Sequence, residues 1–518
     1  MHTLGHSAIT LHQLQQLVAS TTPIALHPSA LAAVLESFDF LKQRAAHQTI
    51  YGVNTGFGPM AQHAIAPSEQ LALQYNLIRS HCAGMGAALP TSVVRAAMIC
   101  QLNTLLIGKS GVAPELLHLI VQLLNHGIHP VVYEHGGVGA SGDLVQLAHL
   151  ALGYLGEGQV WHQGQQQPAT AVFKRYNIAP LRIHLREGLA LMNGTAVMTG
   201  MGLLNVAAAR NLLDWALLAS ALLNEVVSAY DDHLSAPLNA AKAHTSQHQV
   251  AALLRHLLGN SQRLQARPTQ LNQTSTQTFD RKVQEYYSLR CLPQILGPIH
   301  ETIAHSTAIL EREANSVQDN PVVDVATQTI YHGGNFHGDY VALAMDHLRL
   351  AMTKLSILAE RQLNFLLHPA LNGQLPPFVN RGKLGLNFGL QGAQFTATST
   401  TAENQMLANS IYIHSIPSNN DNQDIVSMGT NAASMTWRVI ENGYQVLAVE
   451  FWALVQAIES LDIASNLSPL TRQYYQSIKE HLPAFQEDRP LYPRLQAFQI
   501  QLQEQQLDLW SLLADTTA

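Results

Sequence analysis

The chain has 518 residues and a formal net charge of −7, from 28 lysines and arginines against 35 aspartates and glutamates. Hydrophobic residues make up 47% of it and charged residues only 12%, about half the charged fraction of ordinary soluble domains. The acidic balance and the lack of a basic run argue against a nucleic-acid-binding protein. So little charge covers a monomer of this size poorly, so we expect apolar surface to be buried between the subunits of a homo-oligomer.

Membrane and secreted classes are also disfavoured. The long apolar stretches are interrupted by charged residues such as Arg210 and Glu225, so no membrane span is expected. The N-terminus lacks the basic start and apolar core of a secretory signal. Three cysteines form neither a disulfide framework nor a CxxC metal motif. The sequence predicts a cytoplasmic protein.

The N-terminal part is expected to alternate short helices and glycine-rich loops. Residues 1–50 predict short helical pieces around two prolines. Residues 51–60, YGVNTGFGPM, hold three glycines and a proline and predict a loop. From Gln70 to Gly127 the apolar spacing is helical, with breaks near residues 84–90 and 111–114.

A second glycine-rich loop is expected at residues 129–143, HPVVYEHGGVGASGD, which lead directly into an apolar helix at 144–155. Residues 156–185 mix glycine, glutamine and proline with short apolar runs and are expected to hold a small hairpin. Residues 260–280, rich in glutamine, threonine and serine, predict a mobile surface loop.

After residue 195 the pattern changes to long helical segments that are apolar on nearly every face, as in helices buried in a large bundle. These segments cover residues 196–230, 294–316, 338–367 and 432–462. The sequence therefore predicts a mainly α protein with two domains. A smaller mixed N-terminal domain spans residues 1–200, and an elongated helical-bundle domain with C-terminal helices spans residues 201–518.

Residues 137–142, GVGASG, formally match the GxGxxG fingerprint of dinucleotide-binding proteins. That motif needs a preceding strand, a following helix, and a second strand with an acidic residue about 20 positions on. Here the preceding strand is short, Glu157 lies in a glycine-rich turn, and no alternating strand–helix pattern follows. A dinucleotide-dependent oxidoreductase is therefore a remote alternative, and a tight turn that caps a helix is a simpler one.

The same block, GGVGASGDLVQLAHLALGYLGEG, resembles the signature of the aromatic amino acid ammonia-lyase family, which includes histidine, phenylalanine and tyrosine ammonia-lyases and related aminomutases. Further blocks resemble that family over about residues 49–460: YGVNTGFGP, LMNGT, QEYYSLRCLPQ, GGNFHGD, LNFGLQGAQFTATSTTAENQ and HSIPSNNDNQDIVSMGT. The resemblance implies a mostly helical protomer of the fumarase/aspartase-like superfamily. It also implies a homotetramer whose active sites lie at subunit junctions.

The resemblance further implies a prosthetic group made from the chain itself, 4-methylideneimidazol-5-one (MIO). Elimination of ammonia from an amino acid needs an electrophile for the amine, and no standard side chain is electrophilic. In the family the nitrogen of Gly142 attacks the carbonyl carbon of Ala140, two waters leave, and Ser141 becomes the methylidene. A glycine without Cβ and a small alanine suit this ring closure. No exogenous cofactor and no metal are expected.

Catalytic and substrate-binding roles are carried over from the family onto matching positions. Tyr51 resembles the general base that removes the β-proton, which requires hydrogen-bond donors or a helix N-terminus to stabilise its phenolate. Tyr287 resembles the tyrosine that assists near the electrophile. Arg290 resembles the clamp for the substrate's α-carboxylate, since a guanidinium grips a carboxylate bidentately. The remaining residues expected around the substrate are Asn193, Gln284, Asn320, Phe336 and Asn419.

Substrate choice is expected to depend on His81 and Gln423. Phenylalanine-type members carry an apolar pair at Ser80-His81, so a histidine there indicates a substrate with a hydrogen-bonding tip. Histidine-type members carry glutamate at the position of Gln423 and methionine at that of Gln391. His81 and Gln423 together therefore favour L-tyrosine, which would be converted into trans-p-coumarate and ammonia.

Several alternatives stay open at this point. They are a histidine ammonia-lyase that forms urocanate, a mixed tyrosine/phenylalanine ammonia-lyase, and a tyrosine 2,3-aminomutase. A catalytically silent helical oligomer is disfavoured by the intact motif residues. Metal dependence is suggested only by the 26 histidines, because no HExxH motif or tight Cys/His cluster occurs.

Overall fold

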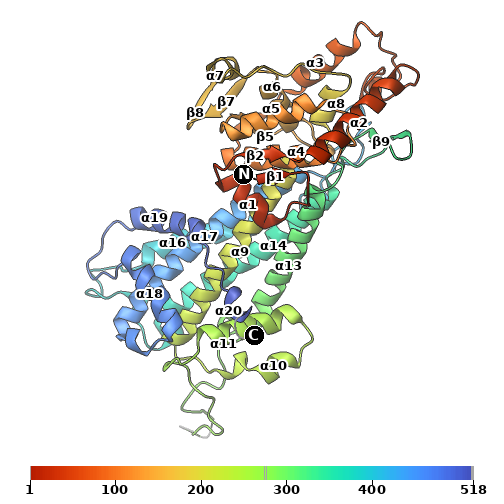
Figure 1. Ribbon diagram of the computed structural model, residues 1–518. Helices are drawn as coiled ribbons and strands as arrows, with labels where there is room; N and C mark the ends of the chain where they lie inside the picture. The colour runs from red at the N-terminus through yellow and green to blue at the C-terminus, as the bar shows by residue number, and fades with distance from the viewer. Residues whose placement is uncertain (1, 273–274, 276, 515–518) are drawn as a thin grey trace. The chain divides into compact units, whose positions relative to one another are not determined.

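The computed structural model describes residues 2–272, 275 and 277–514. The described chain is mainly helical, and its small sheets have two or three strands each (Figure 1). It divides into two compact units, each assembled from three segments. The first unit contains residues 1–207, 305–347 and 410–437, and the second contains residues 208–304, 348–409 and 438–518. From the sequence we expected a domain boundary near residue 200. The first unit has a break at residue 207 but also includes the two later segments, 305–347 and 410–437.

The first unit begins with two helices and a parallel strand pair. Its opening elements are β1 (His2–Leu4), α1 (Leu11–Ala19), β2 (Ile24–Leu26) and α2 (Pro28–Ala45). A capping box starts α1: the Thr10 side chain accepts from the Gln13 N–H, and the Gln13 side chain accepts from the Thr10 N–H. The prediction of short helical pieces around the two prolines is wrong for α2, which is one continuous helix of 18 residues. Pro28 occupies its first turn, where a missing N–H costs nothing.

The helices expected between residues 70 and 127 are confirmed, with breaks where glycine and proline stand. They are α3 (Gln70–His81), α4 (Thr91–Leu106) and α5 (Pro114–Asn125), preceded by the 3₁₀ turn η1 (Gly58–Met60). Every residue of α4 from Val93 to Leu106 is buried, including polar ones. Its low amphipathicity therefore reflects a helix surrounded by protein on all sides.

The glycine-rich stretch at 129–143 is only partly a loop, because three short strands lie in it: β4 (His129–Pro130), β5 (Tyr133–His135) and β6 (Ala140–Asp143). Helix α6 (Val145–Tyr154) follows, as expected. The expected hairpin is confirmed as β7 (Gln159–His162) and β8 (Gln165–Pro168), and β4 joins it to make an antiparallel three-stranded sheet. Two further helices in this part of the chain are α7 (Ala169–Tyr176) and α8 (Glu187–Met192). They are short, so their periodicity is weak.

The small sheets do not provide a dinucleotide-binding fold. That fold needs an open parallel sheet. Among the strands of the described residues only β1 and β2 pair in parallel. Strand β3 (Met85–Ala88) pairs antiparallel with β5, and β9 (Val322–Asp324) pairs antiparallel with β10 (Thr329–Tyr331). The GxGxxG match therefore lacks its structural context.

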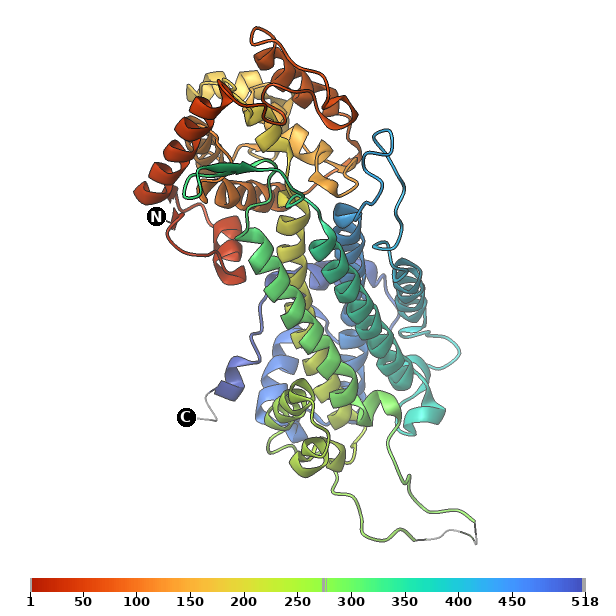
Figure 2. The ribbon, with the colours of Figure 1, turned by 90° about the vertical axis from the view of Figure 1, so that its right-hand side faces the viewer.

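The four expected long helices are confirmed (Figures 1 and 2). Each contributes residues to both units. They are α9 (Ala196–Val226), α13 (Leu292–Ala314), α14 (Asp339–Leu367) and α17 (Gly429–Leu461). In the first unit Ser306 of α13 donates to the Ala344 carbonyl of α14. In the second unit Ser220 of α9 and Gln362 of α14 are hydrogen-bonded, and both are buried. Helix α9 is apolar and long enough to cross a membrane, but 83% of its most apolar window is buried inside the protein.

The second unit packs shorter helices around its share of the long ones. These are α10 (Ala236–Ala240), α11 (Thr245–Leu257), α12 (Tyr287–Arg290), α15 (Pro369–Asn372), α16 (Gln391–Leu407), α18 (Pro469–His481), α19 (Tyr492–Glu504) and α20 (Ser511–Ala514). Short 3₁₀ turns are η2 (Asp232–Leu234), η3 (Pro377–Val379) and η4 (Ala464–Asn466). The described part of residues 260–280 has no helix or strand, and residues 273, 274 and 276 lie outside the description.

One buried carboxyl group in the second unit has no hydrogen-bond partner among the described residues. Glu450 of α17 is fully buried, and neither of its carboxylate oxygens is satisfied. Burial raises the pKa of this carboxyl well above its usual range. The folded chain therefore keeps a proton that the unfolded chain releases above about pH 4.3, so this group lowers stability as the pH rises through that value.

We expect Glu450→Met to raise the thermal unfolding midpoint because it removes an unsatisfied buried carboxyl group. The gain should reach about 1–3 kcal/mol and should grow between pH 5 and pH 8. Calorimetry of both proteins across that pH range measures it. The matched control is Glu459→Met on the same helix, where Glu459 pairs with Lys479 at 2.5 Å and no gain is expected. A gain that does not change with pH would contradict the assignment.

Candidate active site

A cavity of about 510 Å³ in the first unit brings together eight of the residues expected at the site. These are Tyr51, His81, Ser141, Asn193, Asn320, Phe336, Asn419 and Gln423. One face of α3 supplies a wall, because Leu73, Asn76, Leu77, Ser80 and His81 follow helical spacing and all line the cavity. Chain segments separated by hundreds of residues thus meet around one apolar hollow with a few polar groups, as expected of a small-molecule site.

The tripeptide Ala140-Ser141-Gly142 forms the start of β6 and turns tightly against Gly194. A Cβ on Gly142 would lie 1.9 Å from the Gly194 carbonyl oxygen, and the φ of Gly142 is +72°. Only glycine fits such an approach in that conformation. Ala140 is buried, while Ser141 is partly exposed to the cavity.

The turn is held by contacts from two separate parts of the first unit. The Gly139 carbonyl accepts from the Gly338 N–H at 3.0 Å and from Ser427 Oγ at 3.1 Å. The Val138 carbonyl accepts from the Met428 N–H at 3.0 Å. These bonds fix the backbone just before the tripeptide, so its position does not depend on local sequence alone.

Asp143 fixes the other end of the tripeptide. Its carboxylate accepts from the Val197 and Met198 N–H groups in the first turn of α9, and from the Thr430 hydroxyl at 2.6 Å. Its own N–H donates to the Gly194 carbonyl at 2.8 Å. Burial raises the pKa of Asp143 to about 7, and the three donors act against that rise. A helix N-terminus and a hydroxyl therefore hold a carboxyl group directly after the tripeptide.

These residues fit the prosthetic group that the family resemblance implies. Ring closure requires the Gly142 nitrogen to approach the Ala140 carbonyl carbon, which needs a tight turn without side chains in the way. Gly139 and Gly142 face each other in an isolated β-bridge, and Gly142 forms a second one with Gly194. Ser141, the source of the reactive carbon, is the member of the tripeptide that lines the cavity.

Tyr51 lies in the expected loop, and its hydroxyl has one backbone donor. The Gly58 N–H donates to Tyr51 Oη at 3.0 Å. Gly58 has a φ of +52°, and a Cβ there would come within 2.8 Å of Asn419 Nδ2. The Phe57 ring packs edge-on against the Tyr51 ring, with centroids 6.1 Å apart. The glycines of this loop thus allow a backbone donor to reach the tyrosine oxygen.

A buried ion pair supports two of the asparagines of the site, Asn193 and Asn320. Arg186 and Asp319 are 0% and 2% exposed and form a bidentate pair at 2.7 and 2.8 Å. Arg186 also donates to the Asn320 carbonyl at 2.9 Å, and Asn193 Nδ2 donates to the same carbonyl at 3.0 Å. Arg186 therefore orients Asn193 through a shared acceptor. Sequence reasoning missed this residue, since an arginine outside a family block carries no spacing signal.

Gln423 contacts the tripeptide directly. Its Nε2 donates to Ser141 Oγ at 3.1 Å, and its Oε1 accepts from Ser418 Oγ at 3.3 Å. Ser418 and Gln423 also exchange two backbone hydrogen bonds. The side-chain amide of Gln423 is thus oriented with its N–H toward Ser141. Gln423 was expected to act in substrate choice, and this contact with the tripeptide goes beyond that role.

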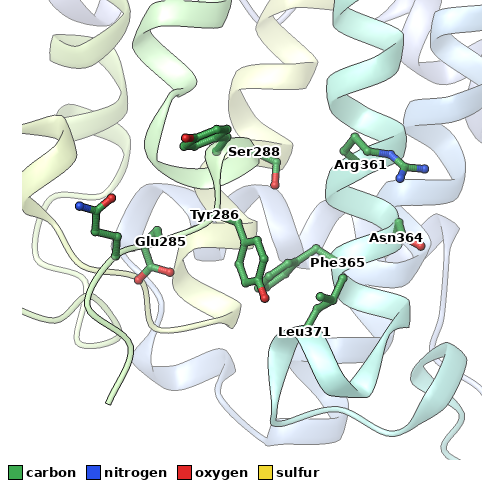
Figure 3. Close-up of a pocket in the computed structure, with 9 residues that line it drawn as sticks. Glu285, Tyr286, Ser288, Arg361, Asn364, Phe365 and Leu371 are labelled. Carbon is green, nitrogen blue, oxygen red and sulfur yellow. The ribbon is translucent and has the colours of Figure 1, made fainter. Parts of the chain in front are cut away.

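The other three expected residues belong to the second unit and do not line this cavity. Gln284 and Tyr287 line a different cavity of about 570 Å³, together with Glu285, Tyr286 and Phe365 (Figure 3). The Tyr286 and Phe365 rings meet edge to face there, with centroids 5.3 Å apart. The Arg290 guanidinium lies 4.6 Å from the centre of the Tyr287 ring. No ion pair joins Arg290 to a carboxylate among the described residues.

Sequence reasoning also missed apolar and polar lining residues of the first cavity. The apolar ones are Phe57, Met60, Leu73, Leu77, Leu144, Leu189 and Met192. The polar ones include Asn76 and Asn422. The helical spacing on α3 could have identified Leu73, Asn76 and Leu77 once His81 was placed in the site. No group of three or more potential metal ligands occurs in the part of the chain that the structure describes.

Comparison with known proteins agrees with this geometry. The family model for aromatic amino acid lyases matches residues 9–480, so the chain belongs to the aromatic amino acid lyase family. The family contains carbon–nitrogen lyases and aminomutases. A solved tyrosine aminomutase from Streptomyces globisporus has a TM-score of 0.92 and 34% identity, and the match covers 97% of this chain and 96% of that one. The expected helical lyase fold is therefore confirmed.

Curated relatives carry three different activities in their names. A tyrosine 2,3-aminomutase from Myxococcus sp. strain Mx-B0 is 42% identical, with 89% of each chain covered. A tyrosine ammonia-lyase from Cupriavidus metallidurans is 39% identical over 88% of this chain and 87% of the relative. A histidine ammonia-lyase from Geobacillus thermodenitrificans is 37% identical over 97% of both. These identities are too similar to decide among the activities.

We expect Arg186→Met to destabilise the protein strongly, because it leaves the buried Asp319 carboxylate without its partner. The loss should be about 3–5 kcal/mol and should be measurable as a lower unfolding midpoint in heat or denaturant.

A matched control is Arg79→Met, which breaks an exposed ion pair with Glu157 whose side chains are 52% and 38% exposed. Its effect should stay within about 1 kcal/mol. The double variant Arg186→Met/Asp319→Asn should recover much of the loss. Equal midpoints for the Arg186 and Arg79 variants would argue against a structural role of the buried pair.

Proposed function

We propose that the protein is an L-tyrosine ammonia-lyase that eliminates ammonia and releases trans-p-coumarate. The observation that carries this proposal is the cavity in which Tyr51, His81, Asn193 and Ser141 meet. Family membership supports a lyase or aminomutase acting on an aromatic amino acid. The choice of tyrosine rests on His81 and Gln423.

The MIO group, formed from Ala140-Ser141-Gly142, would supply the electrophile for the amine that no ordinary side chain offers. Tyr51 removes the β-proton from the substrate, and the Gly58 N–H donor at 3.0 Å stabilises the negative oxygen that this role requires. Asn193 orients the substrate with its remaining hydrogen-bonding capacity. The apolar wall of Leu73 and Leu77 packs against the aromatic ring.

The first-unit cavity offers no lysine or arginine for the substrate's α-carboxylate among its described lining residues. Arg290 has the right chemistry, since its guanidinium has no carboxylate partner in the described chain and lies beside Tyr287. We propose that another protomer of a homotetramer contributes Arg290, Tyr287 and Gln284 to each site. A carboxylate clamp and an assisting tyrosine would then complete the site at a subunit junction.

Two alternatives concern the same site. The aminomutase relatives favour β-tyrosine as a product, which requires the amine to return to Cβ. The histidine ammonia-lyase relatives favour urocanate, although Gln423 offers a neutral amide where a carboxylate would suit an imidazole N–H. We propose a cytoplasmic location.

The first experiment measures the mass of the purified chain and its products. We expect the intact chain to be lighter by two waters than the mass calculated from its sequence. Ser141→Ala should not show this loss of two waters and should be inactive. Incubation with tyrosine, histidine and phenylalanine, followed by absorbance and chromatography, separates coumarate, urocanate, cinnamate and β-tyrosine. Coumarate should form fastest.

Each contrary result points to a different error. A chain with the full mass of its sequence would remove the electrophile and with it the proposed deamination. Urocanate as the fastest product would show that Gln423 is misinterpreted. β-Tyrosine as the main product would make the protein an aminomutase.

A second prediction concerns the base. Tyr51→Phe should lower kcat by about 10²–10⁴, which is the usual contribution of a general base, while the two-water mass deficit persists. Steady-state kinetics with tyrosine and mass spectrometry measure the two quantities.

The matched control is Tyr176→Phe, which removes a hydroxyl bonded to His162 at 2.9 Å outside the cavity and should leave kcat unchanged. A Tyr51→Phe variant that turns over tyrosine at the normal rate would assign the base to another residue.

A further inference from the structure

A small cavity in the first unit lies next to the segment that supports the tripeptide. Its volume is about 10 Å³, and all of its lining residues are buried. The wall contains Asn193 and Gly194 together with residues of α4, α6, α8 and the segment 318–319. Asn193 also lines the large cavity of the first unit, so the two cavities share this residue. A space of roughly 10–15 Å³ holds one water molecule and nothing larger.

Two hydroxyl groups of this wall have no hydrogen-bond partner within the described chain. They are Thr104 Oγ1, on α4, and Ser110 Oγ, in the loop that follows. Thr104 is 6% exposed and Ser110 is 1% exposed, and bulk water reaches neither oxygen. A buried hydroxyl that donates to nothing loses its hydration without compensation. Both hydroxyls therefore indicate a ligand in the cavity that accepts hydrogen bonds.

Three side chains of the same wall have oxygens that can still accept. Asp319 Oδ2, Gln101 Oε1 and Gln318 Oε1 each accept one hydrogen bond from within the described chain. Such an oxygen has two lone pairs, so each keeps one for a further donor. The wall thus combines two unused donors with three unused acceptor sites. A ligand that both accepts and donates matches this combination.

The charge of the wall favours a neutral ligand. Asp319 is the only titratable side chain that lines the cavity among the described residues, and Arg186 pairs with it at 2.7 Å. A carboxylate whose charge is already paired at contact distance attracts a cation only weakly. An ammonium or metal ion also cannot accept the two hydroxyl hydrogens. Water has the right size, two lone pairs and two hydrogens.

We infer that this cavity is a binding site for one internal water molecule, held by the hydroxyls of Thr104 and Ser110. The water accepts a hydrogen bond from each hydroxyl and donates its own hydrogens to side-chain oxygens of the wall. It joins α4 and the following loop to the segment of Asn193 and Gly194, which contacts the Ala-Ser-Gly turn. The inference does not depend on which reaction the protein catalyses.

The direct test is a high-resolution crystal structure of the full chain. We expect one density peak within about 3.2 Å of both Thr104 Oγ1 and Ser110 Oγ, and no peak there in the double variant Thr104→Val/Ser110→Ala. A wild-type cavity without density, with the hydroxyls turned toward backbone carbonyls, would overturn the inference. So would an anomalous peak in this cavity after a rubidium soak, because it would identify a monovalent cation.

Stability of the variants gives an independent test in solution. Thr104→Val preserves the shape of the side chain, and Ser110→Ala removes only the hydroxyl. Each should raise the unfolding equilibrium constant about two- to tenfold at a fixed protein concentration, because each removes a hydrogen bond to the water. The two fold-changes should not multiply in the double variant, since both residues bind the same molecule. Denaturant titrations of the four proteins measure this coupling.

The matched control pairs Thr104→Val with Ser306→Ala. Ser306 is equally buried, but its hydroxyl already donates to the Ala344 carbonyl and it does not line the cavity. These two fold-changes should multiply, as expected for independent sites. Multiplication in the Thr104/Ser110 pair as well would contradict a shared water. A Thr104→Val variant more stable than the wild type would also contradict it, because a dry cavity rewards the loss of an unpaired hydroxyl.

Discussion

The close approach of Gly142 to Gly194 is the constraint on which the site depends. A Cβ would come 1.9 Å from the opposing carbonyl, so the two chain segments can touch only as bare backbone. This contact joins the Ala-Ser-Gly turn to the segment that enters α9, and Asp143 strengthens the joint by capping that helix. Because α9 is among the most deeply buried helices, the turn rests on a rigid support. Preorganisation of this kind limits the motion available to a reacting backbone.

A buried ion pair, Arg186 with Asp319, also supports the residues around the turn. Arg186 and Asp319 are almost completely buried, yet their charges are paired, and the two terminal nitrogens of Arg186 also donate to the Ser110 and Asn320 carbonyls. One of those carbonyls, at Asn320, also receives Asn193. A buried ion pair is a weak source of stability, but it can specify a unique geometry. Here that geometry positions a side chain that faces the cavity.

Much of the fold was predictable because its signals are local. The glycine content of residues 51–60 predicts a loop, and apolar periodicity predicts the long helices. The turn residues of 156–185 predict the hairpin. The length of α2 was underestimated because Pro28 was taken as a break, although it starts the helix. The strands β4, β5 and β6 were missed because two to four residues carry no alternation, and their pairing partners lie elsewhere. The roles of Tyr51 and Arg290 came from resemblance to a family and not from spacing. Contacts such as Gln423 with Ser141 join residues 282 positions apart, which no local pattern encodes.

The discontinuous make-up of the first unit has a consequence for biosynthesis. Ser427, Met428 and Thr430 hold the turn that contains Ala140, Ser141 and Gly142. Most of the polypeptide must therefore be synthesised before these residues can form their hydrogen bonds with the turn, which is made much earlier. Until then the tripeptide is an ordinary nascent loop, so truncated translation products would lack the environment in which its backbone could react. Under the proposed cyclisation, maturation would therefore wait until the segment with Ser427, Met428 and Thr430 has been made.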